Sequence, residues 1–259
     1  MMCGYLLARA GIDVTVLEKH ADFLRDFRGD TVHPSTLQIL YELNLLDSFL
    51  KLPHTKIRTG MIEIGDRAFR IGDFSRLPTV CKFIALMPQW DFLDFLAQQA
   101  AKLPSFHLRM QTEATDLISE NGRVCGLRAQ ASNGDVEIKA GLAIAADGRH
   151  STLRAKSELA VRDLGAPFDV LWLSLPVKPG DPADLIGKVQ GGAVFVMIYR
   201  TDYWQCAYLI PKDGFEAIKA EGLSKFRARL KTIAGFAAGR IDDTITDAAG
   251  GKEIGRAHV

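Results

Sequence analysis

The stretch that decides the fold reads Met1-Met-Cys-Gly-Tyr-Leu-Leu-Ala-Arg-Ala-Gly11 and continues as Ile12-Asp-Val-Thr-Val-Leu-Glu18. The first part predicts a helix, and Gly11 just past its end suits a left-handed helix cap. The second part predicts a short strand of mainly β-branched and apolar residues that ends in an acid. A helix followed by such a strand is the second half of a βαβ unit. We therefore expect a parallel sheet whose first strand and glycine-rich turn are missing from these residues.

The rest of the chain predicts further helices and many short strands. Asn-Gly pairs at 121–122 and 133–134 predict tight turns that join three of the strands into a meander. We expect helices at 34–44, 91–102 and 215–233, and strands at 57–64, 67–71, 83–87, 106–110, 114–119, 124–131, 136–139, 141–146, 168–175, 192–199 and 204–210.

This order of elements predicts an α/β fold with two domains. The first is an incomplete Rossmann-like parallel sheet with a β meander, expected at residues 1–55 and 77–166. The second is a mainly antiparallel sheet built from two separate stretches, 56–76 and 167–234. The final residues 252–259 are expected to be an artefactual tail, because Glu253-Ile-Gly-Arg-Ala-His-Val259 resembles the in-frame translation of a sequencing adapter.

Composition narrows the class of partner. Of 259 residues, 47% are apolar and 24% are charged, and the net charge is +1, so neither nucleic acid nor a stable membrane association is expected. The longest apolar run, 191–199, is half of what a membrane helix needs. Four scattered cysteines and no signal peptide predict a cytoplasmic protein without a zinc site or disulfide framework. The histidines show no metal-ligand spacing, so no metal is expected.

Several ordered motifs together resemble one family. Arg25-Asp-Phe-Arg-Gly-Asp-Thr-Val-His-Pro-Ser-Thr-Leu-Gln-Ile-Leu40, Met87-Pro-Gln-Trp-Asp-Phe-Leu-Asp-Phe-Leu96 and Ala143-Ile-Ala-Ala-Asp-Gly-Arg-His-Ser-Thr-Leu-Arg154 are similar to motifs of the FAD-dependent aromatic hydroxylases. Trp204-Gln-Cys-Ala-Tyr-Leu-Ile-Pro-Lys212 resembles a strand of that family's second domain. The resemblance runs from about residue 5 to residue 233. It implies that the sheet at 56–76 and 167–234 is a substrate domain.

The resemblance also implies roles for six cofactor-binding residues. An acid at the end of the second strand, Glu18, is placed to bind a ribose diol, with Lys19 beside it. Arg28 has the guanidinium fork that suits a pyrophosphate. Gln89 suits the ribityl chain and flavin edge, Ala114 contacts adenine through its backbone, and Asp147 lies near the phosphates.

The implied reaction is hydroxylation of a small phenolic substrate with FAD, NAD(P)H and O₂. The cofactor carries the chemistry, so no catalytic residue is assigned. Arg149 and Arg154 are implied to help NAD(P)H dock. Without the glycine-rich turn and a later Gly-Asp motif, these 259 residues alone are expected to be inactive and, with an open strand edge, to form homo-oligomers.

Two alternatives stay open. The first is a related flavoprotein on the same scaffold, of the halogenase or polyprenyl reductase type, although the tryptophan motif or lysine that would mark such enzymes is not found. The second is a non-enzymatic remnant that acts as a binding module. The aromatic rings at Trp172, Tyr199, Trp204 and Tyr208 favour core packing over cofactor contact, although one face of such a sheet covers the flavin in the resembling family.

Overall fold

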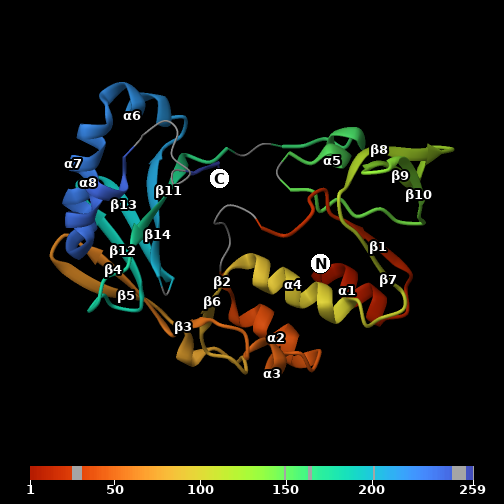
Figure 1. Ribbon diagram of the computed structural model, residues 1–259, viewed down its shortest axis with the longest axis horizontal. Helices are drawn as coiled ribbons and strands as arrows, with labels where there is room; N and C mark the ends of the chain where they lie inside the picture. Colours follow the sequence, from red (N-terminus) through yellow and green to blue (C-terminus); the bar gives the residue numbers. More distant parts are fainter. Residues whose placement is uncertain (25–30, 149, 163–164, 201, 247–254, 259) are drawn as a thin grey trace. The chain divides into compact units, whose positions relative to one another are not determined.

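The computed structural model divides into two compact units, which are described separately (Figure 1). Unit 1 comprises residues 1–25 and 90–164, and unit 2 comprises residues 26–89 and 165–259. The structure describes residues 1–24, 31–148, 150–162, 165–200, 202–246 and 255–258, the last four as backbone only. Residues 26–55 and 77–89 cluster with the second sheet in this division, whereas the sequence assigns them to the cofactor domain; the functional domain boundaries stay a prediction.

Unit 1 begins with the predicted helix and strand. Helix α1 (Met2–Arg9) is followed by Gly11 at φ +81°, and strand β1 (Val14–Leu17) pairs in parallel with β7 (Phe106–Arg109). The helix packs closely on this pair, because a Cβ added at Gly4 would lie 2.6 Å from Cγ2 of Val16. The expected helix–strand half of a βαβ unit is therefore confirmed.

The meander also forms as expected. Strands β8 (Thr112–Glu120), β9 (Arg123–Ala131) and β10 (Gly134–Lys139) make an antiparallel sheet in the order β10-β9-β8. Gly122 at φ +74° and Gly134 at φ +116° take the backbone conformation that the two Asn-Gly turns require. Helix α4 (Gln89–Ala100) precedes this part of the chain and confirms the helix predicted near 91–102.

The predicted buried strand at 141–146 is wrong. This segment has no regular secondary structure, and Leu142 and Ile144 are 74% and 54% exposed. A strand exists only with a hydrogen-bonded neighbour, and among the described residues β1 and β7 form a sheet of two strands that does not include this segment. The apolar sequence therefore has strand propensity without a partner. Short helix α5 (Thr152–Lys156) follows it.

Unit 2 contains a seven-stranded sheet in the order β15-β11-β14-β13-β12-β4-β5. Its strands are β4 (Thr59–Ile64), β5 (Arg67–Asp73), β11 (Phe168–Pro176), β12 (Leu185–Gln190), β13 (Ala193–Arg200), β14 (Tyr203–Pro211) and β15 (Gly255–His258). Only β12 and β4 pair in parallel within it. The expectation that two distant stretches build one mainly antiparallel sheet is confirmed, although the sequence did not predict β12.

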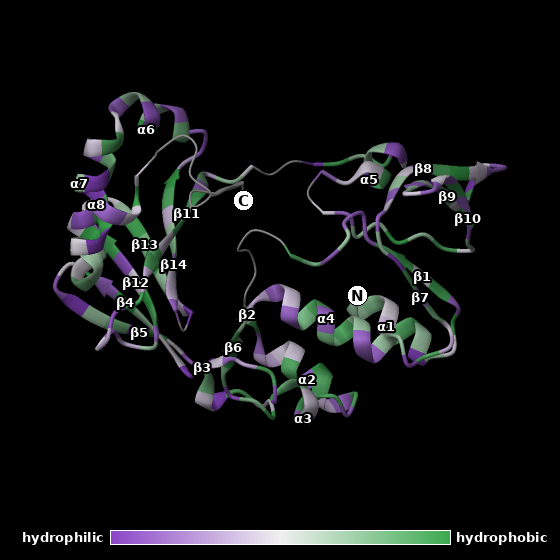
Figure 2. Ribbon diagram, viewed as in Figure 1, coloured by the Kyte–Doolittle hydropathy of each residue, from purple (hydrophilic) through white to green (hydrophobic). Residues whose placement is uncertain are grey.

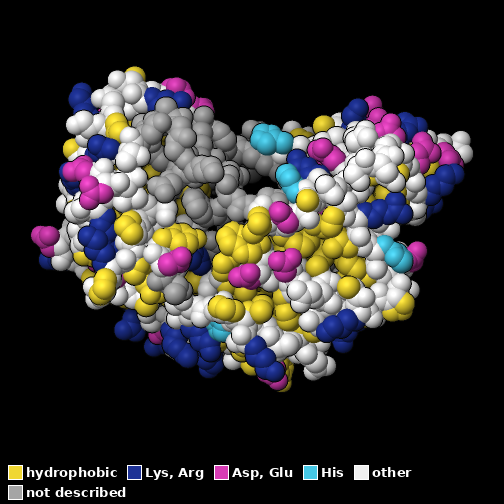
Figure 3. Space-filling view, viewed as in Figure 1, with side chains coloured by type: hydrophobic (Ala, Val, Ile, Leu, Met, Phe, Trp, Pro, Cys, Tyr) yellow, Lys and Arg dark blue, Asp and Glu magenta, His cyan; other side chains and the backbone are white. Residues whose placement is uncertain are grey.

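One face of this sheet is covered by helices α6 (Phe215–Glu221), α7 (Leu223–Ala234), η2 (Gly235–Arg240) and α8 (Ile241–Thr244). Leu171, Leu173, Trp204 and Phe226 are fully or almost fully buried between the two layers. The single helix predicted at 215–233 is wrong, because Gly222 at φ +90° separates α6 from α7. Acidic and basic side chains are interspersed on the outer surface of this helical layer (Figure 3).

A small sheet and two helices complete unit 2. Strands β2 (Thr31–Val32), β6 (Ile84–Leu86) and β3 (Thr55–Ile57) pair in the order β2-β6-β3, beside helices α2 (Pro34–Glu42) and α3 (Leu46–Phe49) and the turn η1 (Phe74–Arg76). The predicted strand at 57–64 is therefore divided between β3 and β4. Ile57, Ile84 and Leu86 pack with Ile198 of the large sheet.

Candidate cofactor-binding site

Glu18 lies where three strands of unit 1 meet. Its backbone amide donates to the carbonyl of Arg109 at 2.9 Å, and its own carbonyl accepts the amide of Thr112 at 2.9 Å. These bonds tie the end of β1 to β7 on one side and to the start of β8. The side chain is half-buried, and its Oε1 accepts the amide of His20 at 2.9 Å. The carboxylate is therefore held in place at the end of the strand.

The start of α1 lies near the same carboxylate. Burial is the main effect on the Met1 amino group and lowers its pKa, while the carboxylate of Glu18 acts in the opposite direction. An electrostatic effect of this kind requires that the two groups be close. The start of α1 and the end of β1 consequently lie near each other, and a dinucleotide fold binds its cofactor beside such elements.

Two further predicted residues lie beside Glu18. The Nζ of Lys19 is 3.6 Å from Oε1 of Glu113, and both side chains are more than half exposed, so this pair contributes little to stability. Ala114 is half-buried in β8, opposite Ala129, and the register shifts immediately after it. The structure therefore brings Glu18, Lys19 and Ala114 together through the bond between β8 and the strand end.

Asp147 and Gly148 form the turn that leads into α5. Burial raises the pKa of Asp147, but hydrogen bonds from the Ser151 hydroxyl and from the Leu153 and Thr152 amides outweigh it and lower the pKa overall. The Leu153 amide donates to Oδ2 at 3.2 Å, and Ser151 caps α5 by accepting the amide of Arg154 at 3.0 Å. Gly148, at φ +87°, has no atom within 4 Å of an added Cβ, so its backbone is open to close approach.

For the two remaining predicted residues, the structure does not test whether they join this site. Gln89 is exposed at the first residue of α4 and clusters with unit 2, and the other four candidates described here belong to unit 1. Arg28 lies outside the described residues, as does Arg149. The phosphate contact assigned to Arg28 stays a prediction.

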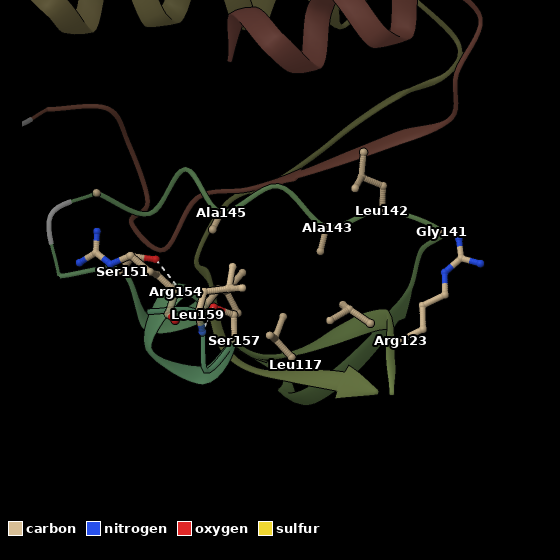
Figure 4. A pocket seen from close by; sticks show the side chains of 13 residues that line it. Leu117, Arg123, Gly141, Leu142, Ala143, Ala145, Ser151, Arg154, Ser157 and Leu159 are labelled. Atoms are coloured by element: carbon tan, nitrogen blue, oxygen red, sulfur yellow. Dashed lines mark hydrogen bonds between the residues drawn. The ribbon is translucent and has the colours of Figure 1, made fainter. Parts of the chain in front are cut away.

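Unit 1 also contains a hollow that sequence reasoning missed (Figure 4). Its volume is about 650 Å³, and its walls come from the meander, the irregular segment and the region of α5. The walls are mainly apolar; Gly148, Ser151 and Arg154 also border the hollow, and the apolar lining residues are Leu117, Val124, Leu142, Ala143, Ala145, Leu153 and Leu159. Leu142, Ala143 and Ala145 line the hollow, whereas the sequence alone predicted that they belong to a buried strand.

Comparison with known proteins shows to which protein family the chain belongs. Residues 1–228 match the FAD binding domain family, and the chain therefore belongs to that family of flavoprotein monooxygenases. The chain is 25% identical over 248 residues to 6-methylpretetramide 4-monooxygenase of Streptomyces rimosus, covering 93% of this chain and 57% of that protein. It is 32% identical over 203 residues to the uncharacterized aromatic compound monooxygenase YhjG of Bacillus subtilis (strain 168), covering 76% and 39%.

The fold agrees with this assignment. The structure of pqsL, a probable FAD-dependent monooxygenase from Pseudomonas aeruginosa, superimposes with a TM-score of 0.77 at 17% identity, covering all of this chain and 70% of that one. The predicted α/β fold with parallel and antiparallel sheets is confirmed. The chain spans about half the length of the curated relatives it matches.

The residues of unit 1 fit the adenosine end of FAD. A held carboxylate at a strand end suits the ribose hydroxyls, and the open backbone at Gly148 permits a close approach. Among the described residues, no cluster of His, Cys, Asp and Glu side chains could hold a metal ion, and no described helix is both long and apolar enough to cross a membrane.

Proposed function

We propose that this chain forms the FAD-binding and substrate-binding parts of a monooxygenase that hydroxylates a small aromatic, phenolic compound. NAD(P)H is the proposed reductant and O₂ the proposed oxygen donor. FAD, when bound, supplies the redox chemistry, and the protein binds and orients the reactants. Glu18, Lys19 and Ala114 would hold the adenosine end, and the Asp147–Gly148 turn would lie against the phosphates.

The proposal of an aromatic substrate is based on the face of the seven-stranded sheet that lies opposite the helices. An antiparallel sheet that is covered on one face commonly presents polar side chains on the other. Here the opposite face carries many apolar side chains together with the hydrogen-bonded Arg200 and Gln205, and the central strands as a whole are coloured largely hydrophobic in Figure 2. Strand pairing places Val170 and Trp172 of β11 beside Leu209 and Ala207 of β14 on that face.

Among the described residues of unit 2, the small sheet covers one end of this face. Ile57, Ile84 and Leu86 of the small sheet pack against Ile198 and its neighbours. Beyond them the apolar surface continues to Ile64 and Phe69 on β4 and β5, which are 50% and 44% exposed. Apolar walls of this kind suit an aromatic ligand, because small-molecule sites are lined mainly by apolar and aromatic side chains.

FAD binding is the first test. Quenching of flavin fluorescence, measured up to millimolar FAD, gives the affinity of the chain. Glu18→Gln should weaken binding roughly 3–10-fold, because the carboxylate is the better hydrogen-bond acceptor for ribose hydroxyls. Glu120→Gln, at the exposed end of β8, is the matched control and should leave the affinity unchanged. No binding, or equal effects of the two variants, would contradict the proposed site.

Turnover is the second test, in a protein that contains this chain. With FAD, NAD(P)H and O₂, phenols should be converted to products that are heavier by one oxygen atom, detected by mass spectrometry. The same assay with added bromide and chloride tests the alternative halogenase activity. Halogenated products without hydroxylated ones would overturn the assignment to hydroxylation.

A further inference from the structure

Two tryptophans of the same sheet differ in the hydrogen bonding of their indole N–H groups. Trp204 has an acceptor, and Trp172 has none among the described residues. Trp204 lies on the helix-covered face and donates from Nε1 to Oδ2 of Asp181 at 2.9 Å. The Nε1 of Trp172 is buried and has no hydrogen-bond partner among the described residues. Buried donors without an acceptor are costly and rare, so each one calls for a physical explanation.

Trp172 lies on the helix-free face. Its neighbours along β11, Leu171 and Leu173, belong to the core beneath the helices, and side chains alternate along a strand, so Trp172 points to the other side. The side chain as a whole is half-buried, and Nε1 lies in its buried part.

The cross-strand neighbours of Trp172 are small. Ala207 pairs with it on β14, Val196 follows on β13, and Gly187 follows on β12. The side chains beside the indole ring in this row are therefore shorter than the ring itself, and Val196 also packs with the small sheet. Aromatic rings pair favourably in offset-stacked or edge-to-face arrangements, which adds to the gain from burying them.

We propose that Trp172 is a positioning residue that packs against the aromatic substrate and donates a hydrogen bond from Nε1 to an oxygen atom on it. This inference rests on the proposed function and adds to it the oxygen-bearing end of the substrate as the recognised feature. A donor without a partner beside apolar side chains favours an aromatic ring that carries an acceptor over the same ring without one.

A matched pair of probes tests the selection. 1-Naphthol and 1-methylnaphthalene have nearly the same shape, and only the first carries an oxygen. Equilibrium dialysis should show that the chain binds 1-naphthol on the order of 5-fold more tightly, as one neutral hydrogen bond allows. Trp172→Phe keeps an aromatic ring and removes the donor. This variant should therefore bind the two probes with about equal affinity. Trp90→Phe, in unit 1, should retain it.

A spectroscopic readout is measured on the wild-type chain, and the variant serves only for assignment. The sequence contains three tryptophans, and the indole N–H resonance that Trp172→Phe removes identifies Trp172 by NMR. In the wild-type chain this resonance should move downfield with 1-naphthol and less with 1-methylnaphthalene.

The outcomes separate the two proposals. Binding of both probes with an unchanged preference in Trp172→Phe, or equal shifts of the resonance with both, overturns the role of Trp172 and leaves the aromatic site standing. If neither probe binds the wild-type chain, the aromatic substrate of the proposed function fails together with this inference.

Discussion

The parallel sheet of unit 1 and the large sheet of unit 2 contrast in how their strands are supported. In unit 2, seven strands form one continuous sheet, and helices cover one of its faces. Leu171 and Phe195 are fully buried beneath these helices. In unit 1, β1 and β7 pair only with each other among the described residues, and the strand-like segment at 141–146 lies exposed. Sheets of two strands are marginal by themselves.

The described strands of the two sheets therefore differ in their support. Unit 2 has a large core beneath its helices, and we expect unit 1, whose described parallel sheet has two strands, to gain more stability from a bound ligand. A ligand that binds only the folded form stabilises it by mass action. FAD should therefore raise the stability of unit 1 more than that of unit 2, and variants in each unit can test whether the units unfold independently.

The largest effect is expected from the buried clamp of unit 2. Arg240 donates from both terminal nitrogens to the two oxygens of Asp181, each at 2.6 Å, and also to the carbonyl of Pro176 at 2.9 Å. Both charged side chains are almost fully buried. Arg240→Ala leaves the carboxylate without its partner and should cost about 3–5 kcal/mol in the free energy of unfolding.

Urea denaturation followed by near-ultraviolet circular dichroism measures this loss. Arg229→Ala is the matched control, because its pair with Glu221 is about 40% exposed on both sides and should be worth less than about 1 kcal/mol. The transition of unit 1 should not move in either variant. Equal losses in Arg240→Ala and Arg229→Ala would show that the clamp does not support unit 2.

A smaller effect is expected at the helix–strand contact of unit 1. An added methyl group at Gly4 would lie 2.6 Å from Cγ2 of Val16 and 3.1 Å from Cε2 of Phe106. Gly4→Ala should therefore destabilise unit 1 by about 1–3 kcal/mol through overpacking, despite the better helix propensity of alanine. Gly141→Ala, where nothing lies within 4 Å, is the control.

Hydrogen exchange of the β1 and β7 amides reports on unit 1 alone. Exchange should accelerate in Gly4→Ala and stay as in the wild type in Gly141→Ala, while the amides of β13 and β14 are unaffected in both. Acceleration in unit 2 as well would mean that the two units unfold as one, which would remove the contrast between them.

Local signals predicted most of the fold. Asn-Gly pairs predict the meander turns, and nearly continuous apolar runs mark β13 and β14, because these features act through neighbouring residues. Strand β12 was missed because Gly187 interrupts its strand pattern; it pairs antiparallel with β13, the next strand along the chain, and in parallel with β4. The error at 141–146 has a different cause, since no local signal tells whether a strand has a partner.

Some features of the candidate site could likewise be predicted from the sequence, and others could not. Glu18 at a strand end and the Asp147–Gly148 turn are readable from short patterns, and the structure places both in unit 1. The hollow in unit 1 was not readable, because its walls come from separate stretches that only tertiary packing joins. The unsatisfied donor of Trp172 was hidden as well, since the sequence does not show that Trp204 has an acceptor and Trp172 has none.

The smallest expected effect is a pH dependence confined to unit 2. Hydrogen bonds from Arg240 lower the pKa of Asp181 below its usual value of 3.8; burial opposes this, and bonds from the Lys178 amide and Trp204 add to the lowering. Because the folded-state pKa is the lower one, the stabilisation is complete above the unfolded pKa and is lost as the pH falls through the folded pKa. Protonation should begin to cost stability below about pH 5, with a limiting slope of about 1.4 kcal/mol per pH unit.

Urea midpoints of unit 2 between about pH 5 and pH 3 measure this slope. Other carboxylates contribute to it, so the comparison is with Arg240→Ala, in which the pKa of Asp181 is no longer held down by the guanidinium. The slope should be shallower in Arg240→Ala than in the wild type. Asp242→Asn, which removes an exposed ion pair with Lys231, should keep the wild-type slope. A slope that is the same in all three proteins would show that the carboxylate of Asp181 does not link the stability of unit 2 to pH.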